Sequence, residues 1–296
     1  MTISIIGRDG LLGGSAATAL GKNCYLSTMA LKAYQLAAGP GWSVSDILCT
    51  SGPQDRPFEE RHGSISVAAV VSGTFQYRTA EGRATLVPGA LMLGNAGACF
   101  ECGHEHGVGD RCLSFHFEPD WFAEIVSSIR GARRIGFSVP RIPPSEALAP
   151  LVAAAEAAGQ DRLELEEIGV RMAGAAVLSQ EGASVAPASA RDRRRVTEAV
   201  RLIEAEPDEP ITLTGLARAV AMSPYHFLRT FSAVVGLTPH QFILGQRLRR
   251  AAARLRRTDD PIADIAFDSG FGDLSTFNRR FRRIMGVTPS AWRQRV

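Results

Sequence analysis

The chain has 296 residues, 45% of them apolar, which is enough to bury a core in each of two domains. No run of about 18 apolar residues occurs, and the N-terminal stretch lacks the pattern of a signal peptide, so we expect a cytoplasmic protein without a membrane partner. Residues 191–296 carry 19 arginines and 11 acidic residues, a formal charge of +8, against −5 for the rest of the chain. This asymmetry predicts a polyanionic partner for the C-terminal third.

Short β-type runs separated by turn residues occupy residues 42–118. Gly82, Pro88-Gly89 and Gly94-Asn95 supply turn signals at the spacing typical of antiparallel strands. The pattern therefore predicts an antiparallel barrel or sandwich.

A cluster of cysteines and histidines lies near the end of this region, in CFECGHEHGVGDRC at residues 99–112. In a strand, His-x-His places both imidazoles on one face, and Cys and His side chains suit Zn²⁺ or another borderline divalent ion. The candidate metal ligands are Cys102, His104, His106 and Cys112. Two other interpretations stay open: a polar pocket with free thiols and no metal, or a thiol that senses redox state.

Helical patterns replace the strands from Asp120 onward. Residues 145–180 predict two helices around Gly159, whose apolar stripes either pack on the barrel or form a dimer face. Residues 181–190, EGASVAPASA, have the composition of a linker. An arginine-rich helix with one apolar face follows the linker.

An internal repeat with a shift of 50 residues organises the C-terminal region. Six residues recur at this shift, namely Phe227, Arg229, Phe231, Gly236, Thr238 and Pro239 as Phe277, Arg279, Phe281, Gly286, Thr288 and Pro289. Ser223 and Asp273 stand where a helix N-cap is needed, so each copy predicts a helix-turn-helix unit closed by a Gly-x-Thr-Pro stop. Residues 241–257 predict a long helix that holds the two copies about one DNA turn apart.

The outward face of each second helix combines arginine with small polar or aromatic side chains. Such a face can contact base edges and phosphates in a major groove. A single helix of this kind would more often be a solvated basic face, but two copies with matched caps and matched arginines favour DNA binding. The outward residues are Tyr225, Arg229, Ser232 and Ala233 in the first copy, and Ser275, Arg279, Arg282 and Arg283 in the second.

Residues 195–295 resemble the DNA-binding domain of the AraC/XylS family of transcription regulators. The matching residues are Leu216-Ala217, Met222-Ser223, Ile265-Ala266, Gly270-Phe271 and the repeated Phe-x-Arg-x-Phe and Gly-x-Thr-Pro motifs. The resemblance implies base contacts from Tyr225, His226, Arg229, Ser275, Thr276, Asn278 and Arg279, and phosphate contacts from Arg247, Arg282 and Arg283. Leu228 and Leu274 depart from the polar residues common at their positions in the family, which leaves contact with a thymine methyl group as their option.

The family resemblance also implies a two-domain α+β fold. Residues 1–180 are expected to form a cupin-like antiparallel β-barrel with a helical extension, and residues 181–190 a linker. Residues 191–296 are expected to form an all-α domain with two helix-turn-helix units joined by a long helix. The implied partners are double-stranded DNA, a small-molecule effector, RNA polymerase and a second copy of the chain.

The sequence therefore predicts a sequence-specific, effector-responsive transcription regulator that performs no catalysis. Activation and repression both stay open. Two alternatives also stay open: a regulator that responds to metal or thiol oxidation, and a cupin-type metalloenzyme fused to a DNA-binding module.

Overall fold

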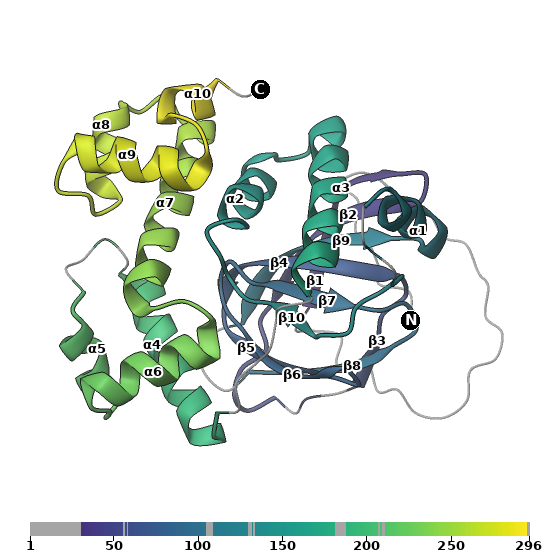
Figure 1. Ribbon diagram of the computed structural model, residues 1–296, viewed down its shortest axis with the longest axis horizontal. Helices are drawn as coiled ribbons and strands as arrows, with labels where there is room; N and C mark the ends of the chain where they lie inside the picture. The colour runs from purple at the N-terminus through teal and green to yellow at the C-terminus, as the bar shows by residue number, and fades with distance from the viewer. Residues whose placement is uncertain are drawn as a thin grey trace.

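Two antiparallel sheets form the N-terminal part of the molecule (Figure 1). The computed structural model describes residues 31–55, 57, 59–104, 109–129, 132, 134–180, 188–206, 208 and 211–294. One sheet has the strand order β1–β2–β9–β4–β7–β10, and the other has the order β3–β8–β5–β6. The strands are β1 Leu31–Gly39, β2 Trp42–Cys49, β3 Glu59–Arg61, β4 Ile65–Gly73, β5 Phe75–Thr79, β6 Gly82–Leu86, β7 Leu91–Gly94, β8 Cys99–Gly103, β9 Asp110–Phe117 and β10 Arg141–Ile142.

Glycines set two of the predicted turns between these strands. Gly82 has a φ of 137° and pairs with Thr79, so the β5–β6 hairpin is closed by a two-residue turn. Gly89, with a φ of 90°, lies in the turn between β6 and β7. The turn signals in the sequence therefore predicted these connections correctly.

Three helices cover the outer face of the larger sheet: α1 Pro119–Ser128, α2 Ala149–Ala157 and α3 Arg162–Ser179. Side chains of β4 alternate, with Val67 and Ala69 in the core under these helices and Ala68 and Val70 in the core between the sheets. The stripe of α3 belongs to the first of these cores, so residues 145–180 do pack on the barrel. The predicted cupin-like α+β architecture is confirmed.

The remaining helices form the C-terminal part, at the left of Figure 1. They are α4 Ala190–Ala205, α5 Leu213–Ala219, α6 Pro224–Val235, α7 Pro239–Arg257, α8 Ile262–Asp268, α9 Leu274–Met285 and α10 Pro289–Arg293. The linker predicted at 181–190 lies outside the described residues except for its last three, and Ala190 already begins α4. No helix among the described residues is long and apolar enough to cross a membrane.

The Gly-x-Thr-Pro motifs do more than stop a helix. Gly236 and Gly286, with φ of 96° and 80°, end α6 and α9 in the left-handed conformation. The threonine in each motif caps the next helix: Thr238 accepts a hydrogen bond from the backbone amide of Gln241, and Thr288 accepts one from the backbone amide of Ala291. Each motif therefore ends one helix and starts another within four residues.

Apolar packing continues from the sheets into the first helix-turn-helix unit. The core between the sheets includes Tyr77 and Leu86 and extends to Phe227 and Phe231 of α6. Arg141 of β10 is 2% exposed and donates hydrogen bonds to the carbonyl oxygens of Thr85 and Val234, which belong to the two parts of the chain. The N-terminal part and the first unit thus share a core.

Candidate nucleic-acid interface

The first helix-turn-helix unit consists of α5 and α6. Ser223 caps α6 by accepting a hydrogen bond from the His226 amide, and Phe227 and Phe231 are fully buried. The turn between the helices contains Ala221, whose φ of 52° is left-handed, a conformation that alanine rarely adopts. The unit is therefore a compact pair of helices that leaves one side of α6 outside.

The second unit, α8 and α9, repeats this construction. Asp273 caps α9 by accepting a 2.7 Å hydrogen bond from the Thr276 amide, and Phe277 and Phe281 are fully buried. Here the left-handed turn position is Gly270, with a φ of 78°. The internal repeat in the sequence is thus a repeat of structure, as predicted.

The outward face of α6 carries the residues that the sequence singles out. Tyr225 is 71% exposed, and the Arg229 guanidinium lies 5.9 Å from the centre of its ring, which holds the two side chains together. The His226 imidazole is 3.6 Å from a carboxylate oxygen of Asp192 in α4. Tyr225 and Arg229 therefore form a paired, solvent-facing surface, while His226 lies against the neighbouring helix.

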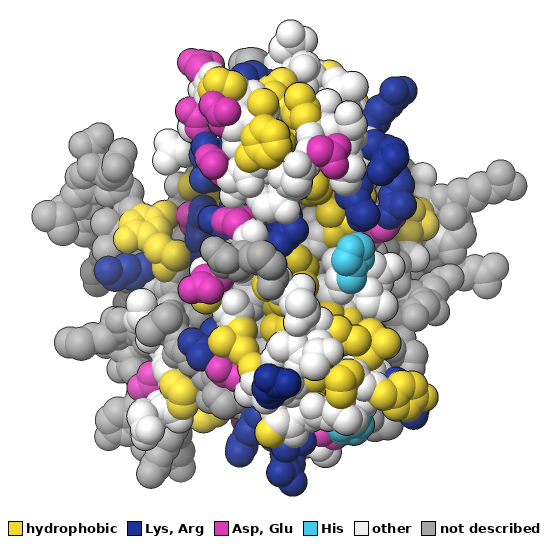
Figure 2. Space-filling model, turned by 90° about the vertical axis from the view of Figure 1, so that its left-hand side faces the viewer, with side chains coloured by type: hydrophobic (Ala, Val, Ile, Leu, Met, Phe, Trp, Pro, Cys, Tyr) yellow, Lys and Arg dark blue, Asp and Glu magenta, His cyan; other side chains and the backbone are white. Residues whose placement is uncertain are grey.

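The outward face of α9 is more polar. Ser275, Asn278 and Arg279 are exposed, and Thr276 is half-buried beside the cap. Leu274 is 36% exposed at the start of the helix. Figure 2 shows basic side chains along one edge of the upper lobe, which α8, α9 and α10 form, and further basic side chains on the lower lobe.

Arginines of α9 line a surface hollow of about 860 Å³. The lining residues are Asn278, Arg279, Arg282, Arg283, Thr288, Pro289 and Ser290. Arg283 also forms a 2.8 Å ion pair with Glu146, next to α2. Arg247 of α7 instead donates a 2.8 Å hydrogen bond to the Gly270 carbonyl, so the structure places it between the connecting helix and the second unit.

Two family models match the chain: one described as an AraC-like ligand binding domain, at residues 48–171, and one described as a helix-turn-helix domain, at residues 216–295. Regulatory protein SoxS from Salmonella typhimurium is 36% identical over 97 residues, which covers 33% of this chain and 91% of SoxS. The chain belongs to the AraC family of transcription regulators. This AraC-family regulator therefore combines a DNA-binding domain with a ligand-binding domain.

Three further relatives match different shares of the regulator. Regulatory protein ada from S. typhimurium is 38% identical over 109 residues, and this chain spans only 30% of its length. A solved transcriptional regulator from Chromobacterium violaceum, of the AraC-type DNA-binding domain class, is 31% identical over 36% of this chain and 94% of its own, with a TM-score of 0.34. ToxT from Vibrio cholerae is 12% identical over 86% of this chain and 98% of its own, with a TM-score of 0.34.

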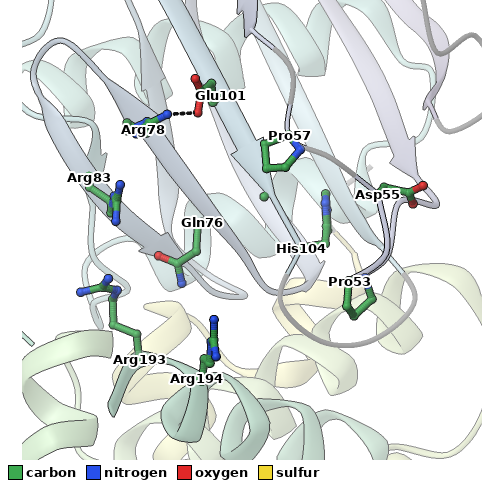
Figure 3. Close-up of a pocket in the computed structure, with 11 residues that line it drawn as sticks. Pro53, Asp55, Pro57, Gln76, Arg78, Arg83, Glu101, His104, Arg193 and Arg194 are labelled. Carbon is green, nitrogen blue, oxygen red and sulfur yellow. Dashed lines mark hydrogen bonds and ion pairs between the residues drawn. The ribbon is translucent and has the colours of Figure 1, made fainter. Parts of the chain in front are cut away.

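A cavity of about 500 Å³ lies between the smaller sheet and α4 (Figure 3). Arg193 and Arg194 of α4 face the strand residues across it, and the Arg78–Glu101 ion pair lies on the strand side. The full lining is Pro53, Asp55, Pro57, Gln76, Arg78, Arg83, Glu101, Gly103, His104, Arg193 and Arg194. Four arginines against two carboxylates favour an anionic ligand.

Three of the four predicted Cys/His ligands line this cavity or lie in the core beside it. His104 lines the cavity, whereas His106 lies outside the described residues. Burial raises the pKa of the Cys102 and Cys112 thiols well above the usual range, which keeps both thiols neutral and disfavours redox chemistry there. Burial alone would lower the pKa of His104, but hydrogen bonds to Asp110 and Cys49 raise it to about 9.

The other histidines of this domain have partners. His62 contacts the Tyr77 hydroxyl at 2.7 Å and the Ser66 hydroxyl at 3.2 Å, and burial lowers its pKa to about 4. His116 contacts the Ser64 hydroxyl at 3.3 Å. Both histidines therefore belong to the hydrogen-bonded interior.

Several residues at these sites carried no signal in the sequence. Cys49 meets His104 and Asp110 only because β2 pairs with β9, which local spacing does not show, whereas Asp110 lies six residues after His104. Arg193 and Arg194 read as part of a basic helix, and the cavity that they close is formed only when α4 docks on the barrel.

Proposed function

We propose that this AraC-family regulator reads two adjacent major-groove segments with α6 and α9. The observation that carries this proposal is the pair of matched helices, each capped, each buried along a phenylalanine stripe, and each exposing an arginine beside polar or aromatic side chains. Arg229 and Arg279 suit guanine, because an arginine fork matches two acceptors on its edge and discriminates by about 1–3 kcal/mol.

The remaining site residues are proposed to make additional contacts with bases, sugars or phosphates. Tyr225, Ser275 and Asn278 are exposed beside the two arginines and suit base or sugar contacts, and Thr276 lies next to them. His226 and Arg247 would first have to leave Asp192 and the Gly270 carbonyl to reach DNA. Arg282 and Arg283 suit phosphates, since they line the hollow beside α9.

The effector in this proposal is a small anionic molecule bound in the cavity between the smaller sheet and α4. Arg193 and Arg194 belong to the helix that packs on α6, while Arg78 and Arg83 belong to the barrel. An anion held by both sets would bias how the first unit is presented to DNA. Effector binding therefore acts through position, without chemistry at the cavity.

Further partners follow from the same mechanism. The protein would act in the cytoplasm, where its DNA is, and would affect RNA polymerase from its bound site. Leu163 and Leu178 of α3 are 76% and 64% exposed and lie with Val170 at roughly helical spacing. These three exposed side chains are distinct from the buried stripe of α3 that packs on the barrel, and they support a homodimer.

Selection of bound sequences from random DNA tests the proposal. We expect two conserved half-sites about one helical turn apart. Arg229→Ala should relax the preference at one half-site and Arg279→Ala at the other. Arg282→Ala is the matched comparison, because loss of a phosphate contact weakens all sequences alike and lowers the salt slope by about one. Equal losses on selected and random DNA for Arg279→Ala would exclude its role in base recognition.

A further inference from the structure

Three side chains of different chemistry converge where β2 ends and β9 begins. A cysteine sulfur, an imidazole nitrogen and a carboxylate oxygen, from Cys49, His104 and Asp110, all lie within 4.8 Å of one another. His104 Nε2 is 2.6 Å from Asp110 Oδ1, and the two side chains are only 5% and 8% exposed. The cluster is therefore compact, with the His104 and Asp110 side chains largely shielded from solvent and Cys49 half-buried.

The backbone holds these residues in place before any ligand arrives. Cys49 and Asp110 are direct partners in the β2–β9 register, and His104 follows the last residue of β8. Gly109 has a φ of 83°, and a Cβ there would overlap the Cys49 carbonyl oxygen. Gly73, paired with Asp110, also leaves no room for a Cβ. Two glycines thus allow the strands to approach closely enough to bring the three side chains together.

We propose that Cys49, His104 and Asp110 bind a divalent ion of the zinc class. Thiolate, imidazole and carboxylate together are ligands of Zn²⁺, whereas Mg²⁺ and Ca²⁺ take all-oxygen sets. Three protein ligands leave a fourth position for water or for a bound molecule, as in open zinc sites. Because His104 also lines the cavity between the barrel and α4, that fourth position lies next to the cavity.

The neighbouring thiols of Cys112 and Cys102 are not ligands in this proposal. Cys112 lies in the core between the sheets, and its thiol donates a 3.4 Å hydrogen bond to Asp110 Oδ2, the oxygen that does not contact His104. Outer hydrogen bonds of this kind orient a metal-binding carboxylate. Cys102 packs against the same core. The structure therefore assigns Cys49 and Asp110 as ligands with His104, and gives Cys112 a positioning role.

Cobalt and zinc titrations of the full chain, first stripped of metal with a chelator, test the proposal. One equivalent of Co²⁺ should bind and give the intense near-ultraviolet band of a thiolate–cobalt bond. Zn²⁺ should displace it, and competition with a chromogenic chelator should give the zinc affinity. Cys49→Ser should abolish the band, and Asp110→Asn and His104→Gln should each weaken Zn²⁺ at least tenfold, in line with the loss expected when a ligand or its support is removed.

The matched control is Cys99→Ser, which removes a half-buried thiol from β8 outside the cluster and should leave the band and the zinc affinity unchanged. Circular dichroism of each variant checks folding, and if Cys49→Ser fails to fold, Asp110→Asn and His104→Gln decide the outcome. Absence of stoichiometric binding by the native chain would overturn the proposal. So would an unchanged band in a folded Cys49→Ser protein, or a zinc affinity that none of the three substitutions changes.

Discussion

The two helix-turn-helix units share one design but are attached to the rest of the molecule in different ways. The first shares a buried core with both sheets, and Arg141 joins its last turn to the barrel from inside. The second has a core of its own with α7 and α10, into which α2 sends Ala153. Its ion pair with the residues beside α2, Arg283–Glu146, is exposed, and α7 adds the Arg256–Glu164 pair, whose arginine side chain is 12% exposed.

This difference indicates how a signal from the ligand-binding domain would travel. Buried apolar contacts and buried hydrogen bonds resist solvent, whereas exposed ion pairs contribute only about 0–1 kcal/mol each. A change in the barrel should therefore reach the first unit directly and the second mainly through the rigid helix α7. The first unit is the regulated one in this account, and the second reads DNA more independently.

The largest expected effect comes from removing a buried phenylalanine ring from the core of either helix-turn-helix unit. Phe231→Ala and Phe281→Ala should each destabilise by about 3–5 kcal/mol, because both remove a fully buried ring. The two substitutions should differ in which helices and strands they destabilise. Hydrogen exchange should increase in α6 and in β5 and β6 for Phe231→Ala, but only in α7 to α10 for Phe281→Ala. The same pattern for both variants would show that the two units are attached alike.

The buried link should matter more than the exposed one. Arg141→Met leaves the carbonyls of Thr85 and Val234 without their donor, and should cost about 2–4 kcal/mol. Glu146→Gln breaks the Arg283 pair and should cost less than about 1 kcal/mol. Urea unfolding of the two variants measures both. An equal cost would remove the distinction between the buried and the exposed attachment.

Glu204 gives the first unit's attachment a dependence on pH. This α4 carboxylate accepts a 3.0 Å hydrogen bond from the Gly73 amide of β4. Burial raises its pKa to about 7, against the opposing effects of that hydrogen bond and of Arg249. The folded state therefore holds the proton more tightly than the unfolded chain. The stabilisation that comes from protonated Glu204 is greatest below pH 4.5 and is lost as the pH rises through 7.

Substitution by the neutral isostere isolates this contribution. Glu204→Gln keeps an acceptor for the Gly73 amide and should flatten the fall in stability between pH 5 and 8, a change on the order of 3 kcal/mol for a shift of this size. Unfolding by urea at the two pH values measures the slope. A variant with the slope of the native protein would contradict the assignment to Glu204.

The smallest expected effect comes from substitutions in the turns of the two helix-turn-helix units. Ala221→Gly should stabilise the first unit by about 0.5–1 kcal/mol, because it removes a left-handed alanine. Gly270→Ala should do the reverse, since a Cβ there would lie 2.8 Å from the Arg247 guanidinium. Thermal unfolding measures whether each substitution raises or lowers the stability. A destabilising Ala221→Gly would mean that the turn is held by more than its backbone conformation.

The sequence predicted what is local and repeated. Phe227, Arg229 and Phe231 recur at 277, 279 and 281 because each unit must bury the same face and expose the same arginine. Strand turns at Gly82 and Gly89 were also evident, because glycine is the residue that their backbone favours. These signals depend on neighbours along the chain, so the chain displays them directly.

Contacts between distant segments could not be predicted in this way. Arg141 stands between a proline and an isoleucine and reads as a loop residue, yet it is buried by both parts of the chain. Cys49 and Asp110 are 61 positions apart and meet through strand pairing. The ligand set predicted from the sequence, Cys102, His104, His106 and Cys112, stays a prediction. The site proposed from the structure shares only His104 with it and takes Cys49 and Asp110 as the other two ligands.

The spacing of the two half-sites tests the central claim most directly. Binding of the full chain to its selected DNA site should be compared with binding to the same site carrying about 5 extra base pairs between the half-sites, half a helical turn. Because α7 holds the units at a fixed separation, we predict that affinity falls to the level of random DNA, and that about 10 extra base pairs do not restore it. Unchanged affinity for the site with the half-turn insertion would contradict reading of adjacent grooves by α6 and α9.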